Sequence, residues 1–410
     1  LDEAKSATPG RAWTKYLTVI GPAFIAGAWQ FGPGNLTSAV QAGGKFQYSL
    51  IWVILVSTIL MIFYTDMSVR IALNSEGSLI DSVKRTLGKP VGVLAGVGVF
   101  LITLMFSVGN AVGSGLGLSL IFGGSTVMWT LICTLVVASV MLFKNTYSVV
   151  EKILVSLVVM MAIGFILSAF LIKPDWGSAA QGLLPTFPAG VGLLLVALIG
   201  TNFSINAAFC TGYATRQRGL KQWQYKHIVI GDTIPGIVAP GIMTALVIIV
   251  AAAATQLTGE APGSLAQLAN IFRPAAGDIG YYIFSLGFFG AAFSSMVANS
   301  SNGGMLLADG LGWGNNLSEK RVKILVYAVL AFGAVVAAVF GGKSPVQLIV
   351  VANALTVLVA PILGALLIVL SNNKKLMGTM VNTWWQNVMV GIGLAAILAT
   401  CYRLIIVLLG

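Results

Sequence analysis

Charged residues are scarce in this sequence. Lys, Arg, Asp and Glu make up 9% of its 410 residues, whereas 57% are hydrophobic and the mean hydropathy is +0.94. A soluble chain of this length carries about a quarter charged residues, so this chain has too few to cover a water-exposed surface. The composition excludes a cytosolic enzyme, a disordered chain and a secreted disulfide scaffold. It predicts an all-α polytopic membrane protein.

Histidine and cysteine are nearly absent. His227 is the only histidine, and Cys133, Cys210 and Cys401 lie in apolar runs without metal-ligand spacing. Haem, zinc and iron–sulfur sites need clusters of such residues, and redox motifs need closely spaced cysteines. We therefore expect no cofactor, no redox chemistry and no enzymatic activity.

Long apolar runs take up most of the chain. A membrane-spanning helix needs about 20 predominantly apolar residues. On that scale the sequence predicts eleven spans, separated by turn-forming clusters rich in Gly, Pro, Lys and Asp. Their approximate residues are 17–43, 46–73, 92–122, 126–143, 150–172, 189–214, 227–256, 280–308, 322–341, 345–371 and 384–409.

The basic residues are distributed unequally between the two sides of the membrane. With the N-terminus placed inside, eighteen of the 23 Lys and Arg residues lie on the inner side. The five on the outer side are Lys45, Lys173, Arg273, Lys343 and Arg403. Because cytoplasmic loops collect Lys and Arg, we expect an integral cell-membrane protein with a cytoplasmic N-terminus and an external C-terminus. The same asymmetry explains the net charge of +11 as a topology signal with contact to anionic lipid, so no nucleic-acid partner is expected.

Two predicted spans are interrupted by residues that break helices. The first contains Phe-Gly-Pro-Gly-Asn at residues 31–35, where two glycines and a proline remove helix propensity at mid-depth. The sixth contains the polar run Gly-Thr-Asn-Phe-Ser-Ile-Asn at residues 200–206. Non-helical backbone in a membrane is tolerated only where it is buried in protein or lines a polar cavity. The alternatives are a packing kink in the first span and hydrogen bonds to neighbouring helices in the sixth.

The two interruptions are five helices apart, and five is an odd number. The second set of five helices therefore starts on the opposite face of the membrane, which predicts an inverted repeat. Within a single domain, residues 1–410, the first repeat is about 17–172, the second about 189–371, and an extra helix covers about 384–409. Paired interruptions of inverted repeats mark the substrate site of a secondary transporter.

Short motifs along nearly the whole chain resemble the Nramp family of divalent metal transporters. These motifs are Gly21–Phe24, Gly32–Asn35, Gln41–Phe46, Ala197–Gly200, Asp232–Thr233 and Gly287–Ser295. The resemblance implies the LeuT-type fold of two inverted five-helix repeats, with helices 1 and 6 broken, followed by an eleventh helix. Within the family, the sequence looks most like the Nramp-related magnesium transporters, a branch that lacks the usual metal-site residues.

The resemblance also implies an ion-binding site, and there the chain departs from the family pattern. Gly32 stands where the family has its metal-binding aspartate, whereas the metal-binding asparagine is kept as Asn35. Ser204 replaces the family's methionine, and Thr201 matches a residue that contributes a backbone carbonyl. A coordinating polar residue of the tenth span aligns near Asn353. The residues predicted to bind the ion are Gly32, Asn35, Thr201, Asn202, Ser204 and Asn353.

The family's proton-pathway residues are replaced as well. Ser107 and Asn110 stand where the family has Asp and Glu, and Thr211 stands where it has a second histidine. Asp66 and Asp232 lie near cytoplasmic helix ends, where we expect a helix cap or an ion pair with a nearby basic residue. Because a proton relay normally needs intramembrane Asp, Glu or His, we predict transport that is not coupled to protons.

The predicted site favours a hard cation. Loss of the thioether removes a preference for soft transition metals, and a neutral site of hydroxyl, amide and carbonyl oxygens suits Mg²⁺, which dehydrates reluctantly. We therefore predict import of partly hydrated Mg²⁺ by alternating access, driven by the membrane potential, with Mn²⁺ as a further candidate and no obligatory protein partner. The alternatives are proton-coupled Mn²⁺ or Fe²⁺ uptake, a carrier for monovalent cations or polar organic solutes, and a membrane receptor.

Overall fold

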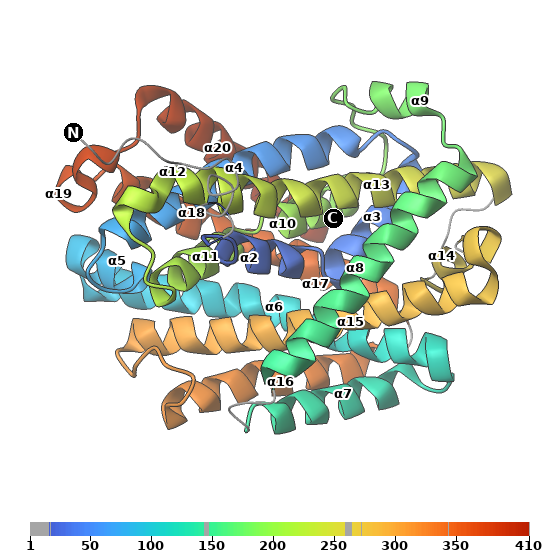
Figure 1. Ribbon diagram of the computed structural model, residues 1–410, viewed down its shortest axis with the longest axis horizontal. Coiled ribbons are helices and arrows are strands. Elements are labelled where there is room, and N and C mark those ends of the chain that lie inside the picture. Colours follow the sequence, from blue (N-terminus) through green and yellow to red (C-terminus); the bar gives the residue numbers. More distant parts are fainter. Residues whose placement is uncertain are drawn as a thin grey trace, which may run out of the picture.

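The computed structural model describes residues 16, 18–142, 147–258, 265–271, 273–342 and 344–409. Every regular element within these residues is helical, which confirms the predicted all-α class (Figure 1). The helices of the first half are α2 (Pro22–Gln30), α3 (Pro33–Phe46), α4 (Ile51–Asn74), α5 (Leu79–Leu87), α6 (Lys89–Phe122), α7 (Thr126–Val140), α8 (Tyr147–Ile172) and α9 (Trp176–Gln181). Those of the second half are α10 (Gly192–Asn202), α11 (Ile205–Gln217), η1 (Gln222–Gln224), α12 (Tyr225–Ile228), η2 (Val229–Thr233), α13 (Ile234–Thr258), α14 (Leu265–Ile271), α15 (Arg273–Leu311), α16 (Lys320–Phe340), α17 (Pro345–Leu355), η3 (Thr356–Leu358), α18 (Ala360–Ser371), α19 (Lys374–Met377), η4 (Gly378–Met380) and α20 (Trp384–Leu409).

The helices agree with a polytopic membrane protein. Within the described residues, seven helices are long and apolar enough to cross a membrane, and an eighth is added if the bent pair 345–358 and 360–371 counts as one span. Each of the eleven predicted spans coincides with a helix or a pair of helices, although α7 is shorter than a typical span. The second span begins later than predicted, at Ile51, because residues 47–50 form turns. The short helices α5, α9, α14 and α19 were not predicted, because none is a long apolar run.

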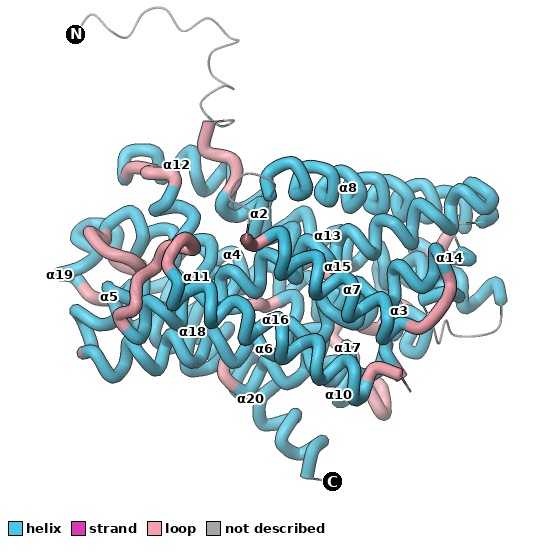
Figure 2. Tube along the Cα trace, turned by 90° about the horizontal axis from the view of Figure 1, so that it is seen from below, coloured by secondary structure: helices cyan, strands magenta, loops and turns pink. Residues whose placement is uncertain are grey.

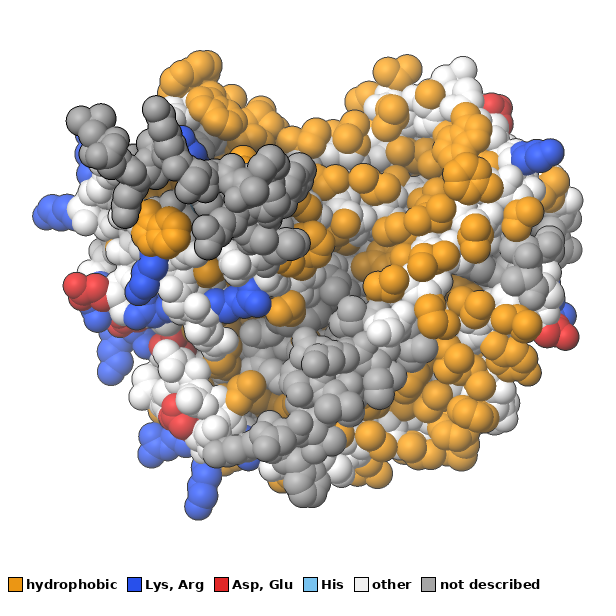
Figure 3. All heavy atoms as spheres, viewed as in Figure 1, with side chains coloured by type: hydrophobic (Ala, Val, Ile, Leu, Met, Phe, Trp, Pro, Cys, Tyr) orange, Lys and Arg blue, Asp and Glu red, His pale blue; other side chains and the backbone are white. Residues whose placement is uncertain are grey.

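The long helices run roughly along the long axis of the molecule (Figures 1 and 2). We call the end that carries α5, α12 and α19 the α5 end, and the end that carries α9 and α14 the α14 end. Most Lys and Arg side chains on the face drawn in Figure 3 lie at the α5 end, whereas hydrophobic side chains cover much of the rest. α6 packs along α15, and α3 packs along α13. The helix breaks lie within this packed bundle.

Both predicted helix breaks are present. α2 ends at Gln30 and α3 begins at Pro33, with Gly32 between them in an extended conformation (φ −82°, ψ −176°). α10 and α11 are separated by Phe203 and Ser204. The tenth span also bends, by 41° between its two halves, and Pro361 stands in the first turn of the second half. This third discontinuity was not predicted from the sequence.

The half-helix α2 is held tightly against the start of α13. A Cβ atom on Gly27 would lie 2.0 Å from the backbone oxygen of Gly236, so only glycine permits this approach. Just before α13, in the π-helical turn η2, the fully buried Asp232 accepts hydrogen bonds from the backbone N–H groups of Gly21 (2.7 Å) and Ala23 (2.8 Å). These groups belong to the N-terminus of α2, where a negative charge is stabilising. The predicted capping role of Asp232 is confirmed.

The second acid near a helix end forms an ion pair, as predicted. The Nε atom of Arg70 lies 2.8 Å from Oδ2 of Asp66, one turn away on α4, and both side chains are buried. Arg70 also donates to the backbone oxygen of Met380 (2.7 Å) and to Oδ1 of Asn382 (2.6 Å), while the hydroxyl of Tyr225 donates to Oδ1 of Asp66 (2.7 Å). The pair therefore connects α4 to α12 and to the segment before α20.

Replacing Arg70 should destabilise the protein strongly. Arg70→Leu leaves the buried Asp66 carboxylate without its partner, a change that typically costs about 3–5 kcal/mol of unfolding free energy. Arg85→Leu is the matched control, because Arg85 is 61% exposed in its pairs with Glu76 and Asp81, and exposed pairs contribute about 0–1 kcal/mol. Thermal unfolding of the purified protein in detergent, followed by tryptophan fluorescence, should show a large loss for Arg70→Leu alone. Equal midpoints for the two variants would contradict this prediction.

Candidate ion-binding site

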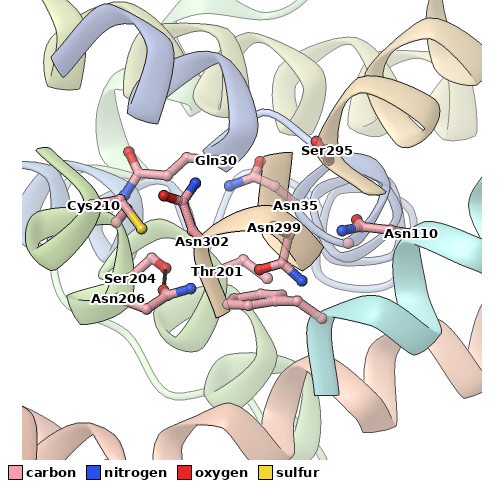
Figure 4. A pocket seen from close by; sticks show the side chains of 14 residues that line it. Gln30, Asn35, Asn110, Thr201, Ser204, Asn206, Cys210, Ser295, Asn299 and Asn302 are labelled. Carbon is pink, nitrogen blue, oxygen red and sulfur yellow. Dashed lines mark hydrogen bonds between the residues drawn. The ribbon is translucent and has the colours of Figure 1, made fainter. Parts of the chain in front are cut away.

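A small cavity lies where the two broken helices meet. It has a volume of about 40 Å³. Since a buried water needs roughly 10–15 Å³, the cavity has room for about three waters. The side chains around it come from four separate stretches of the chain, 30–35, 106–110, 201–210 and 295–302 (Figure 4). The lining residues are Gln30, Gly32, Gly34, Asn35, Phe106, Asn110, Thr201, Ser204, Asn206, Ala207, Cys210, Ser295, Asn299 and Asn302.

Many of the residues that line the cavity are polar, but none of them carries a formal charge. Its polar groups are carboxamides, hydroxyls, one thiol and the backbone of the two breaks. Neither a charged side chain nor a histidine is among the described residues that line it. Among all residues that the structure describes, no three His, Cys, Asp or Glu side chains come together as a metal-binding group. Any ligand held here is therefore bound by neutral oxygen and nitrogen atoms or by the thiol sulfur.

Four of the six predicted site residues line the cavity. Gly32 and Asn35 do so from the first break and the start of α3, and Thr201 and Ser204 do so from the second break. The Ser204 hydroxyl donates to Oδ1 of Asn206, which also lines the cavity (Figure 4). The inverted repeat thus brings together residues that are about 170 positions apart in the sequence.

The side chains of the other two predicted residues are not part of the lining. Asn202 points to α4, where its Nδ2 donates to Ser57 Oγ (2.6 Å) and Thr58 Oγ1 (3.0 Å). Asn353 lies behind the first break, so close that a Cβ atom on Gly34 would lie 2.0 Å from its Nδ2. Both side chains therefore lie beside the breaks and outside the lining of the cavity.

The positions that match the family's proton pathway have different surroundings. Asn110 lines the cavity. The hydroxyls of Ser107 and Thr211 donate to backbone oxygens of their own helices, those of Leu104 (2.7 Å) and Ala207 (2.9 Å). Neither hydroxyl has a proton to transfer near neutral pH, in contrast to the acids and histidine of the family pattern.

Several lining residues were not predicted to bind the ion. Gln30 ends α2, and Ser295, Asn299 and Asn302 follow one face of α15. The spacing of four and then three residues is the pattern of one helix face, which is the signal that could have revealed them. Nδ2 of Asn299 donates to the backbone oxygen of Thr103 (3.0 Å), and Nδ2 of Asn302 donates to that of Ala298 (2.8 Å). Both amide oxygens are therefore available to the cavity.

The cavity adjoins a larger vestibule at the α5 end. This vestibule has a volume of about 400 Å³ and shares Cys210 and Asn302 with the cavity. Lys323 is the charged residue in its described lining. A separate hollow of about 650 Å³ at the α14 end, which includes Lys45, has no lining residue in common with the cavity. The larger space next to the cavity therefore lies toward the α5 end.

Comparison with known proteins agrees with this architecture. Residues 23–407 match the family model described as natural resistance-associated macrophage protein-like, or Nramp. The divalent metal cation transporter MntH of Bacillus subtilis (strain 168) is 26% identical over 388 residues, which cover 92% of this chain and 89% of MntH. MntH of Chromohalobacter salexigens is 23% identical over 398 residues, covering 93% of this chain and 89% of that one.

Solved structures show the same fold. A mutant of the Eremococcus coleocola manganese transporter superposes with a TM-score of 0.78 at 16% sequence identity, covering 97% of this chain and 88% of that one. MhsT in complex with L-phenylalanine superposes with a TM-score of 0.57 at 14% identity, covering 92% of this chain and 98% of that one. The fold is the LeuT-type fold that the resemblance implied, and because the family model spans nearly the whole sequence, the chain belongs to the Nramp family.

Proposed function

We propose that this protein imports partly hydrated Mg²⁺ by alternating access, without coupling to protons. The proposal starts from its family, whose similar members are named as transporters of divalent metal cations and of manganese. The observation that carries it is the neutral cavity at the two helix breaks, lined by amides and hydroxyls instead of a carboxylate and a thioether.

The chemistry of these groups favours a hard ion. Amide, hydroxyl and carbonyl oxygens suit Mg²⁺, whereas a thioether favours softer transition metals. Mg²⁺ binds six oxygens and usually keeps several of its waters. A cavity with room for about three waters accommodates an ion that has shed part of its hydration shell. A polar organic solute would need a larger space.

Two features reduce the electrostatic cost of a dication in a neutral site. The last turns of α2 and α10 both contribute to the lining, through Gln30 and Thr201. Carbonyls at a helix C-terminus lack intrahelical partners, and each such end acts as about half a negative charge. The waters that the ion retains spread the remaining charge.

Energy for uptake would come from the membrane potential. We propose that the α5 end faces the cytoplasm, because most Lys and Arg residues fall on that side. The N-terminus is cytoplasmic in the same orientation. At a potential of about 100 mV, two inward charges release about 4.6 kcal/mol, which supports a concentration ratio of about 10³. Asp66 is engaged by Arg70, and Asp232 by the N-terminus of α2, so neither acid is at the cavity.

Transport in proteoliposomes tests the proposal directly. With an inside-negative potential, and with luminal Mg²⁺ and pH dyes read together, we expect Mg²⁺ entry without luminal acidification. Asn35→Leu removes a lining amide at similar volume and should reduce entry at least about tenfold, while protein-free vesicles give the leak. Entry accompanied by acidification would instead indicate proton-coupled transport, and absence of Mg²⁺ entry would contradict the proposal.

Restoring the family's metal ligands should change ion selectivity. Gly32 has an extended backbone that any residue can adopt, so Gly32→Asp is sterically reasonable. Combined with Ser204→Met it supplies a carboxylate and a thioether, and we expect Mn²⁺ to bind at least about tenfold more tightly, or about 1.4 kcal/mol. Titration calorimetry of the two single variants and the double variant measures this change. An unchanged Mn²⁺ affinity would show that these positions do not form the site.

A further inference from the structure

One hydrogen-bond conflict lies directly beside the cavity. The hydroxyl oxygen of Thr244, on α13, is 2.6 Å from Oδ1 of Asn35 and 2.7 Å from the backbone oxygen of Pro240. A hydroxyl has one proton and can donate fully to only one of these two acceptors. On the other side of the same amide, Nδ2 of Asn35 is buried and has no partner. Thr244 is fully buried and Asn35 is 1% exposed, so bulk water does not resolve the conflict.

A half-turn of the Asn35 amide resolves both problems at once. The Thr244 proton then goes to Pro240, the usual back-bond of a helical threonine to the residue four positions earlier. Nδ2 of Asn35 takes the place of Oδ1 and donates to the Thr244 oxygen, which becomes an acceptor. Each donor group in the trio then has an acceptor, and Oδ1 of Asn35 takes the place of the unpartnered Nδ2 in a residue that lines the cavity.

We propose that Thr244 is a positioning residue that orients the Asn35 amide with its oxygen toward the transported ion. This inference rests on the proposed function, because only a cation requires the oxygen at that place. The opposite orientation would present an NH₂ group to the cavity, and an amide N–H repels a cation. Thr244 does not line the cavity and acts through Asn35 alone.

The anchoring of Thr244 explains why it can set this orientation. Its side chain is fixed by the bond to Pro240, inside the helix that packs along α3. A β-branched side chain in a helix has few rotamers, so its hydroxyl stays in place when the amide turns. Within the described residues, the side-chain hydrogen bond of the Asn35 amide is the one to Thr244.

Substitutions at Thr244 separate orientation from packing. Thr244→Val keeps the shape but removes the acceptor, so the Mg²⁺ affinity should fall about five- to tenfold, as expected for one hydrogen bond. In transport, KM should rise by that factor while kcat changes less than about twofold. Thr244→Ser keeps the hydroxyl and should recover most of the affinity. Thr255→Val, on the same helix, is the matched control, because the Thr255 hydroxyl donates to the backbone oxygen of Ala251, four residues earlier, and does not line the cavity.

A double-mutant cycle gives the decisive comparison. Asn35→Asp places an oxygen on both sides of the group, so its orientation no longer matters. In that background Thr244→Val should cost less than about twofold in the Mg²⁺ Kd, measured by titration calorimetry on the purified full chain. A loss of the same size in both backgrounds, or an unaffected Kd in Thr244→Val alone, would overturn this inference and leave the proposed function intact. Failure of the unaltered protein to bind Mg²⁺ would overturn both.

Discussion

The structure depends on one constraint: backbone polar groups inside a membrane must be paired or must face a polar space. The breaks after Gln30 and after Asn202 release amides and carbonyls from two helices in the interior of the bundle. The fold brings the two breaks together, so that residues of both line the same small cavity. Asn202 and Asn353, which lie behind the breaks, complete the polar surroundings without entering the cavity. The site thus follows from the same feature that interrupts the helices.

The cavity solves this problem with neutral groups. A buried carboxylate would bind a dication more tightly but would also carry a large desolvation cost whenever the ion leaves. A neutral site avoids that cost, since neither the occupied nor the empty state leaves an unpaired protein charge. Lys323 lies in the lining of the vestibule, and Lys45 lies in that of the hollow at the α14 end. Neither side chain is an anion that would bind a cation there.

The sequence predicted the helical class, the positions of the spans and both helix breaks, because these depend on local features: apolar length, glycine and proline. The inverted repeat predicted that the two breaks mark one site, and the resemblance to the family pointed to Gly32, Asn35, Thr201 and Ser204 within it, which all line the cavity. It did not predict that Asn202 turns to α4, because the direction of a side chain at a helix end depends on the neighbouring helix. Asn299 of α15 was interpreted as a packing residue and not as an ion ligand for a similar reason, since polar residues on a helix serve equally well for packing. The bend in the tenth span has no strong signal beyond Pro361, which is ordinary at the start of a helix.

The cap formed by Asp232 has a mechanical consequence. It joins a half-helix of the first repeat to a helix of the second, and the Gly27–Gly236 contact presses the same two elements together further along. Pulling α2 away from α13 would strand a buried carboxylate and the amide groups that it satisfies, a loss of several kcal/mol. Rocking both elements together breaks none of these bonds. We therefore expect α2, η2 and the start of α13 to move as one stiff unit in any rearrangement around the vestibule.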